Sequence, residues 1–236
     1  MNGLHGELEC ADDPARFFLG TYLRTTVAVG AALDRGFFED SAWVTAWDVD
    51  FADLYLDALT AYRKDPATAA LPWRRAFAAA RDLPPEAHVL LGMNAHINYD
   101  LPQSLVRMIP VPDFEDPELV GLRHRDHVRI DRVLASRVAA EDVALQGVGG
   151  RRTPLDRALA PLNRCASRIF LREARRRVWA TTTVLHEARR RGTAEYEDRL
   201  HELETVSADR IQDILRPGPV LLRLAVRGFG VTLPPR

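Results

Sequence analysis

Four polar side chains that could do chemistry lie within one apolar stretch of the chain, Gly92 to Pro102: Asn94, His96, Asn98 and Asp100. On a helix, which turns by ~100° per residue, His96 and Asp100 share one flank and the two asparagines share the other. A histidine beside a carboxylate can hold a metal ion or move a proton, and amides can bind a substrate. Because a buried polar group without a partner costs ~1–3 kcal/mol, these four residues predict a common ligand.

Pro102 adds a backbone feature to the same stretch. It cannot donate a backbone hydrogen bond and crowds the carbonyl of Asn98, so we expect the helix to bend or end here. The freed carbonyl could contact a ligand, a metal ion or a water molecule. The simpler alternative is that His96 hydrogen-bonds Asp100 while the asparagines cap neighbouring elements.

Asp126 is the second candidate, on a helix predicted for residues 117–145. By spacing it projects from the middle of an apolar face, which is made by Leu119, Leu122, Ile130 and Val133. A carboxylate in such a place must be paired, metal-bound or protonated, since burying it ionised and alone costs several kcal/mol. We therefore expect Asp126 to face His96 and Asp100 across two helices.

A helix predicted for residues 154–191 carries further candidates on one stripe, Arg175, Trp179 and His186. Arg175 could clamp an anion or assist catalysis, Trp179 could contact the substrate, and His186 could act as an acid or as a further metal ligand. The alternative is that Arg175 stacks on Trp179 at the rim of the core.

His124, His127 and Asp131 form a crude zinc-like spacing on another side of the helix at 117–145. The spacing lacks the paired i, i+4 histidines and the glutamate of helical zinc proteases. Solvated histidines are the favoured interpretation.

Helix starts are marked by a capping residue followed by proline, and period-2 alternation is scarce. The sequence predicts an all-α fold: one domain over residues 1–236, built as a bundle of about seven helices. We expect a polar N-terminal arm at 1–13 and an apolar C-terminal tail at 217–236, which packs on the bundle or on a second copy in a homodimer. The predicted helices cover residues 14–34, 41–62, 66–81, 86–106, 117–145, 154–191 and 194–215.

Composition restricts the function classes. A formal charge of −1 over 236 residues gives no attraction to nucleic acid. No stretch has the length of a membrane span, and the start lacks the features of a signal peptide. Two isolated cysteines fit a reducing compartment, so we expect a soluble cytoplasmic protein with no membrane partner.

The run from Leu91 to Pro102 resembles the signature of an uncharacterised, mainly actinobacterial family of helical proteins, in which the phrase His-Ile-Asn-x-Asp-Leu-Pro is the specific part. The resemblance implies a helical fold over most of the chain and a site near this run. It implies no activity or substrate.

These observations support three hypotheses. The first is a small-molecule enzyme, such as a metal-assisted hydrolase, with His96, Asp100, Asp126 and His186 around Zn, Fe or Mn. The second is a cofactor-free acid/base isomerase or cyclase using the same residues. The third is a non-catalytic binding or dimerisation protein, in which the polar cluster only fixes the register of the helices.

Overall fold

A computed structural model describes residues 1–148, 154–218 and 226–234, without the side chains of 135–170. All regular elements in these ranges are helical, which confirms the all-α prediction. In chain order they are α1 (Asn2–Cys10), α2 (Ala15–Asp34), α3 (Ser41–Lys64), the 3-10 turn η1 (Pro66–Thr68), α4 (Leu71–Phe77), α5 (Pro85–Ala95), η2 (His96–Asp100), α6 (Leu101–Met108), α7 (Val111–Glu115), α8 (Pro117–Val148), α9 (Pro154–Arg191) and α10 (Thr193–Leu215).

The predicted helix starts are confirmed by side-chain caps. Asp13, Asp65 and Asp116 each accept a hydrogen bond from the backbone nitrogen two residues later, at 2.9, 3.0 and 2.8 Å. Asp40 caps α3 in the same way through the nitrogen of Trp43. Each cap satisfies a helix-terminal N–H that has no partner within the helix. The remaining predicted cap, Thr153, lies outside the described residues.

The polar run Asn94–Asp100 interrupts a helix without ending it. The chain continues from α5 into α6 through a π-helical turn, in which the nitrogen of Leu101 donates to the carbonyl of His96, five residues back. Pro102 occupies the first turn of α6, where its missing N–H costs little. The predicted distortion at Pro102 is thus a widened turn, a feature frequent at functional sites.

Four short elements, α1, η1, α4 and α7, differ from the sequence prediction. Residues 1–13 are not a simple polar arm, since α1 packs against α2 and buries Leu8 completely. The helix predicted for 66–81 is η1 followed by the shorter α4, and α7 lies between the helices predicted for 86–106 and 117–145. These elements gain their stability from packing on neighbours, which local sequence does not reveal.

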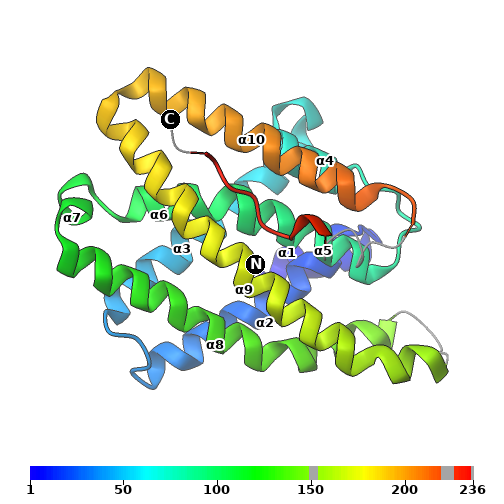
Figure 1. Ribbon diagram of the computed structural model, residues 1–236. Coiled ribbons are helices and arrows are strands. Elements are labelled where there is room, and N and C mark those ends of the chain that lie inside the picture. Colours follow the sequence, from blue (N-terminus) through cyan, green and yellow to red (C-terminus); the bar gives the residue numbers. More distant parts are fainter. Residues whose placement is uncertain (149–153, 219–225, 235–236) are drawn as a thin grey trace.

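The segment α5–η2–α6 lies at the centre of the bundle (Figure 1), in contact with α2, α3, α4, α9 and α10. Helices α8 and α9 lie side by side, and α10 packs against α4 and α9. One cluster of buried side chains joins residues from α1 through α10, with the aromatic rings of α2, α3 and α4 at its middle. The polar residues of η2 are therefore enclosed on several sides.

The end of the chain lies as an extended segment beside α9 and α10 (Figure 1, red). Phe229, Val231 and Leu233 alternate inward and are almost fully buried, whereas Val226 is exposed. The predicted tail residues 219–225 lie outside the described residues. None of the helices in the described part of the chain is long and apolar enough to span a membrane.

Candidate functional site

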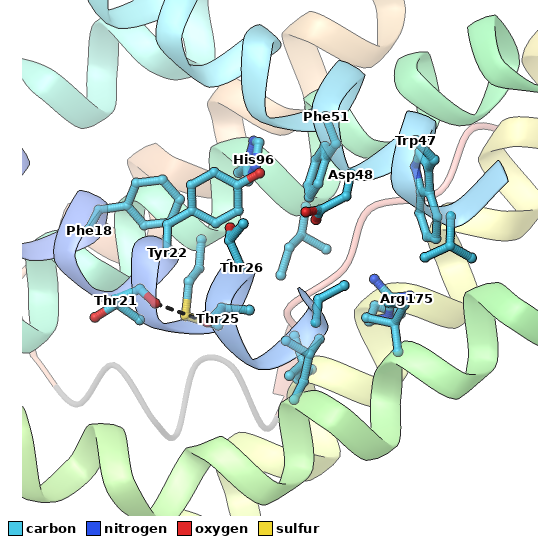
Figure 2. Close-up of a pocket in the computed structure, with 17 residues that line it drawn as sticks. Phe18, Thr21, Tyr22, Thr25, Thr26, Trp47, Asp48, Phe51, His96 and Arg175 are labelled. Atoms are coloured by element: carbon cyan, nitrogen blue, oxygen red, sulfur yellow. Dashed lines mark hydrogen bonds between the residues drawn. The ribbon is translucent and has the colours of Figure 1, made fainter. Parts of the chain in front are cut away.

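A cavity of about 110 Å³ lies between α2, α3, η2, α8 and α9 (Figure 2). Its wall is mostly aromatic and aliphatic, with a few polar groups, as is usual for small-molecule sites. An engineered apolar cavity of similar size, ~150 Å³, binds benzene. The lining residues are Phe18, Thr21, Tyr22, Thr25, Thr26, Val29, Val44, Trp47, Asp48, Phe51, Met93, His96, Ile97, Ile130, Leu134, Leu171 and Arg175.

His96 is the cavity residue whose contacts define its chemistry most clearly. Its Nδ1 lies 2.9 Å from Oδ2 of Asp100, and the same oxygen accepts a hydrogen bond of 2.9 Å from Nε1 of Trp73. Burial raises the pKa of Asp100, and the hydrogen bonds from His96 and Trp73 oppose that shift. We assign the proton of the neutral imidazole to Nδ1, because Oδ2 of Asp100 then accepts from both His96 and Trp73. Nε2 of His96 then carries a lone pair, and no described residue donates to it.

Aromatic rings enclose His96. The Phe51 ring stacks on the imidazole with centroids 3.6 Å apart, and Tyr22 meets it edge-on at 4.7 Å. Phe18 completes this side at 5.8 Å and rests on Gly92, where a Cβ atom would lie 2.4 Å from the Phe18 ring. Burial among these rings lowers the pKa of His96, although the contact with Asp100 opposes the shift. The imidazole is therefore neutral at physiological pH and available as a base.

Asp48 faces the same cavity from α3. Figure 2 shows its carboxyl group directed toward the space bordered by Tyr22, Thr26 and Arg175. Burial alone raises its pKa to about 6, with no hydrogen bond or ion pair from the described residues to counter the shift. Asp48 is half-buried, so a ligand in the cavity could supply the donor that the described residues do not.

Further polar atoms also line the cavity wall. Among the described residues, no hydrogen-bond partner of ordinary geometry exists for the hydroxyls of Tyr22 and Thr26 or for the indole nitrogen of Trp47, although Thr26 interacts with the Tyr22 hydroxyl. The pKa of Tyr22 is raised well above its usual value, first by burial and then by the carboxylates of Asp48 and Asp100.

Arg175 reaches the cavity from α9, as its stripe predicts, but its guanidinium is engaged elsewhere. Nε donates to Asp131, and Nη2 donates to the carbonyl of His127 at 2.6 Å. The alternative interpretation, in which Arg175 stacks on Trp179, is wrong, because these two bonds set the orientation of the guanidinium. Arg175 is buried and already paired, so it is not a counter-ion for Asp48. Asp48 therefore has no cationic partner among the described residues.

Asp126 is buried, as predicted, but it does not line the cavity or join His96 and Asp100. Its two carboxylate oxygens accept hydrogen bonds of 2.8 Å from the backbone nitrogens of Glu39 and Asp40, and Arg129 donates to one of them at 3.2 Å. The carboxylate therefore fixes the turn before α3 onto α8. This arrangement corrects the expectation of one site shared by the three residues.

Asn94 and Asn98 are also buried away from the cavity. Both amide groups donate to the carbonyl of Phe229, at 3.2 and 3.0 Å, and Asn98 accepts a bond of 3.3 Å from the nitrogen of Val231. They hold the C-terminal segment. This agrees with the simpler interpretation of the sequence, in which the asparagines cap neighbouring elements. The structure gives them no position from which to bind a ligand in the cavity.

The remaining candidates lie in other places. His186 stacks on Phe114 with centroids 3.8 Å apart and contacts Arg189, and burial lowers its pKa to about 4. Trp179 packs against His124 at 4.6 Å and does not line the cavity.

His127 corrects the expectation of solvated histidines on α8. Its ring is buried between Trp47 and Trp179, and burial lowers its pKa well below the usual value. Asp131 of the same motif is paired with Arg175. No group of three or more His, Cys, Asp or Glu side chains in the described ranges is placed to hold a metal ion.

The sequence reasoning missed Asp48 and the hydroxyl of Tyr22 as site groups. Asp48 lies four residues after Val44 and four before Ala52, and both of these are buried. Its helical phase therefore placed it on the inner face of α3.

The chain belongs to a family of unknown function, DUF5995, whose profile matches residues 1–217. No curated protein and no solved structure matches the chain.

Proposed function

We propose that this protein is a small-molecule enzyme that transfers a proton by general acid–base catalysis in the cavity beside His96. The single observation that carries the proposal is a neutral imidazole in the cavity wall, oriented by Asp100 and with Nε2 unoccupied. A histidine held in one tautomer by a buried carboxylate is the usual arrangement of a general base.

The surroundings of His96 suit this role. Asp100 receives hydrogen bonds from both His96 and Trp73, so the ring of His96 is fixed before a ligand binds. When Nε2 takes a proton, the carboxylate stabilises the resulting imidazolium. The raised pKa of Asp48, about 6, allows this group to exchange a proton near neutral pH. The cavity thus carries a base and a second proton-exchanging group in an apolar wall.

Of the two enzyme hypotheses, the donor set favours the cofactor-free one. The metal hypothesis requires His96, Asp100, Asp126 and His186 to converge. The carboxylate of Asp126 is already filled by two backbone N–H groups and Arg129, and His186 is stacked on Phe114. The donor atoms of these residues therefore do not fit a shared ion.

The test is proton transfer to metabolites in heavy water. The purified protein is incubated in D₂O with a small-molecule extract of bacterial cells, and mass spectrometry follows each metabolite. We expect at least one compound to gain deuterium at carbon or to change into an isomer with the unaltered protein. His96→Gln, which keeps a hydrogen-bond donor for Asp100, abolishes that change.

A matched control is His201→Gln, which makes the same substitution at an exposed histidine on α10. This variant retains the full activity. If no metabolite changes, or if His96→Gln is as active as His201→Gln, the acid–base proposal is wrong. Binding of a metabolite without any conversion would favour the binding-protein hypothesis.

A further inference from the structure

We propose that the cavity binds a small organic ammonium ion, a compact alkylamine in its protonated form, with Asp48 as its anionic partner. This inference rests on the proposed function in that it names the ligand class of the same cavity. It depends on the placement of Asp48, on the aromatic wall around it, and on the pairing of the nearby guanidinium.

Charge favours a cation in the cavity. The cavity wall contains two charged groups, Asp48 and Arg175. The guanidinium of Arg175 is paired with Asp131 and donates to the carbonyl of His127, whereas Asp48 has no counter-ion in the described part of the chain. A cation would satisfy this imbalance, and an anion would be repelled.

Aromatic side chains line the cavity, among them Tyr22, Trp47 and Phe51 (Figure 2). Aromatic rings attract cations through their negative faces, and cages of such rings recognise organic ammonium groups. The hydroxyls of Tyr22 and Thr26 offer further acceptors for N–H groups.

The size of the cavity limits the ligand. A volume of about 110 Å³ admits a branched alkylamine of a few carbon atoms. Asp48, Thr25 and Thr26 are half-buried, whereas Tyr22 and Trp47 are buried, so the ammonium group would lie on the solvent side and the alkyl group inside. Nε2 of His96, at the inner wall, would then face the ligand rather than the bulk solvent.

The experiment compares isobutylammonium with isobutyl alcohol, which have the same carbon skeleton and differ in charge. Binding to the full chain is measured at about pH 7.5, where Asp48 is ionised and the amine is protonated, by NMR titration of the His96 and Trp47 ring signals. We expect isobutylammonium to bind at least about 10-fold more tightly than the alcohol, which corresponds to ~1.4 kcal/mol.

Asp48→Asn is the test variant, and Asp57→Asn, an exposed aspartate of the same helix, is its control. We expect Asp48→Asn to remove the preference for the ammonium ion while the alcohol still binds, and Asp57→Asn to change neither. Equal binding of the two probes by the unaltered protein would overturn the ammonium inference and leave the catalytic proposal standing. Failure of both probes to bind would overturn the inference and also contradict the use of this cavity as a ligand site.

Discussion

Asp48, which is half-buried, and Asp100, which is buried, are two carboxylates of one protein with different surroundings. Asp100 accepts hydrogen bonds from His96 and Trp73, which oppose the rise in pKa that its burial causes. Asp48 accepts no hydrogen bond from the described residues, and burial raises its pKa to about 6. A group that costs stability and is still present in a cavity wall is typical of a functional site.

The first prediction concerns the stability of Asp48→Asn as a function of pH. The pKa of Asp48 is about 6 in the folded protein and 3.8 in the unfolded chain, so its ionisation disfavours folding as pH rises through 6. Relative to the unaltered protein, Asp48→Asn should therefore be more stable at pH 8 than at pH 4 by about 1–3 kcal/mol in free energy of unfolding. The lower figure allows for screening by water. Urea denaturation of both proteins at the two pH values measures this difference. A variant that is destabilised equally at the two pH values would show that Asp48 has a structural role.

The pairing of His96 with Asp100 followed from the sequence because residues four apart on a helix are neighbours in any fold. Two of the partners of Asp126 did not. They are backbone groups of residues 39 and 40, more than 80 positions away, and no local pattern in the sequence identifies a turn as the partner of a buried carboxylate. Helical phase showed that Asp126 is buried and could not show what satisfies it.

At the scale of elements, Asp126 joins the turn before α3 to the middle of α8. We predict that Asp126→Asn destabilises the protein by ~2–4 kcal/mol, because the amide keeps one acceptor and turns an N–H group toward a backbone N–H. Urea denaturation measures the loss, and the exposed Asp57→Asn supplies the control. A loss below ~0.5 kcal/mol would contradict the assigned role.

The starts of α2 and α8 were predictable because their caps are local, at Asp13 and Asp116. The π-helical turn at His96–Asp100 was predictable only as a distortion near Pro102. Its exact form depends on contacts of η2 with α3, α9 and α10, which belong to the assembled bundle. The same turn directs His96 toward the cavity and Asn98 toward the chain end.

At the scale of the whole molecule, the C-terminal segment completes the core. Beyond the bonds to Asn94 and Asn98, Glu173 accepts hydrogen bonds of 3.1 Å from the nitrogens of Phe229 and Gly230, and Arg199 donates to the carbonyl of Pro234. The sequence indicated an apolar tail, but it could not indicate that the asparagines of the central helix are the groups that hold this segment.

We predict that a chain ending at Pro217 is less stable by several kcal/mol. The truncation exposes the surfaces covered by Phe229, Val231 and Leu233, each worth ~1.5–3 kcal/mol when buried, and it leaves two buried amides without acceptors. Thermal and urea denaturation of the two chains measures the change. Equal stability of the truncated chain would show that the segment does not pack in solution as it does here.

The most direct test of the central claim is the protonation state of the His96 ring, measured by ¹⁵N NMR of the imidazole between about pH 5.5 and 8. The lowered pKa predicts a neutral ring at about pH 7 and above, and the hydrogen bond to Asp100 predicts that Nδ1 carries its proton. Asp100→Asn should remove this preference between the two nitrogens. A proton on Nε2 of the neutral ring, or protonation of the ring with a midpoint above about 6.5, would contradict the assignment of His96 as the base of the cavity.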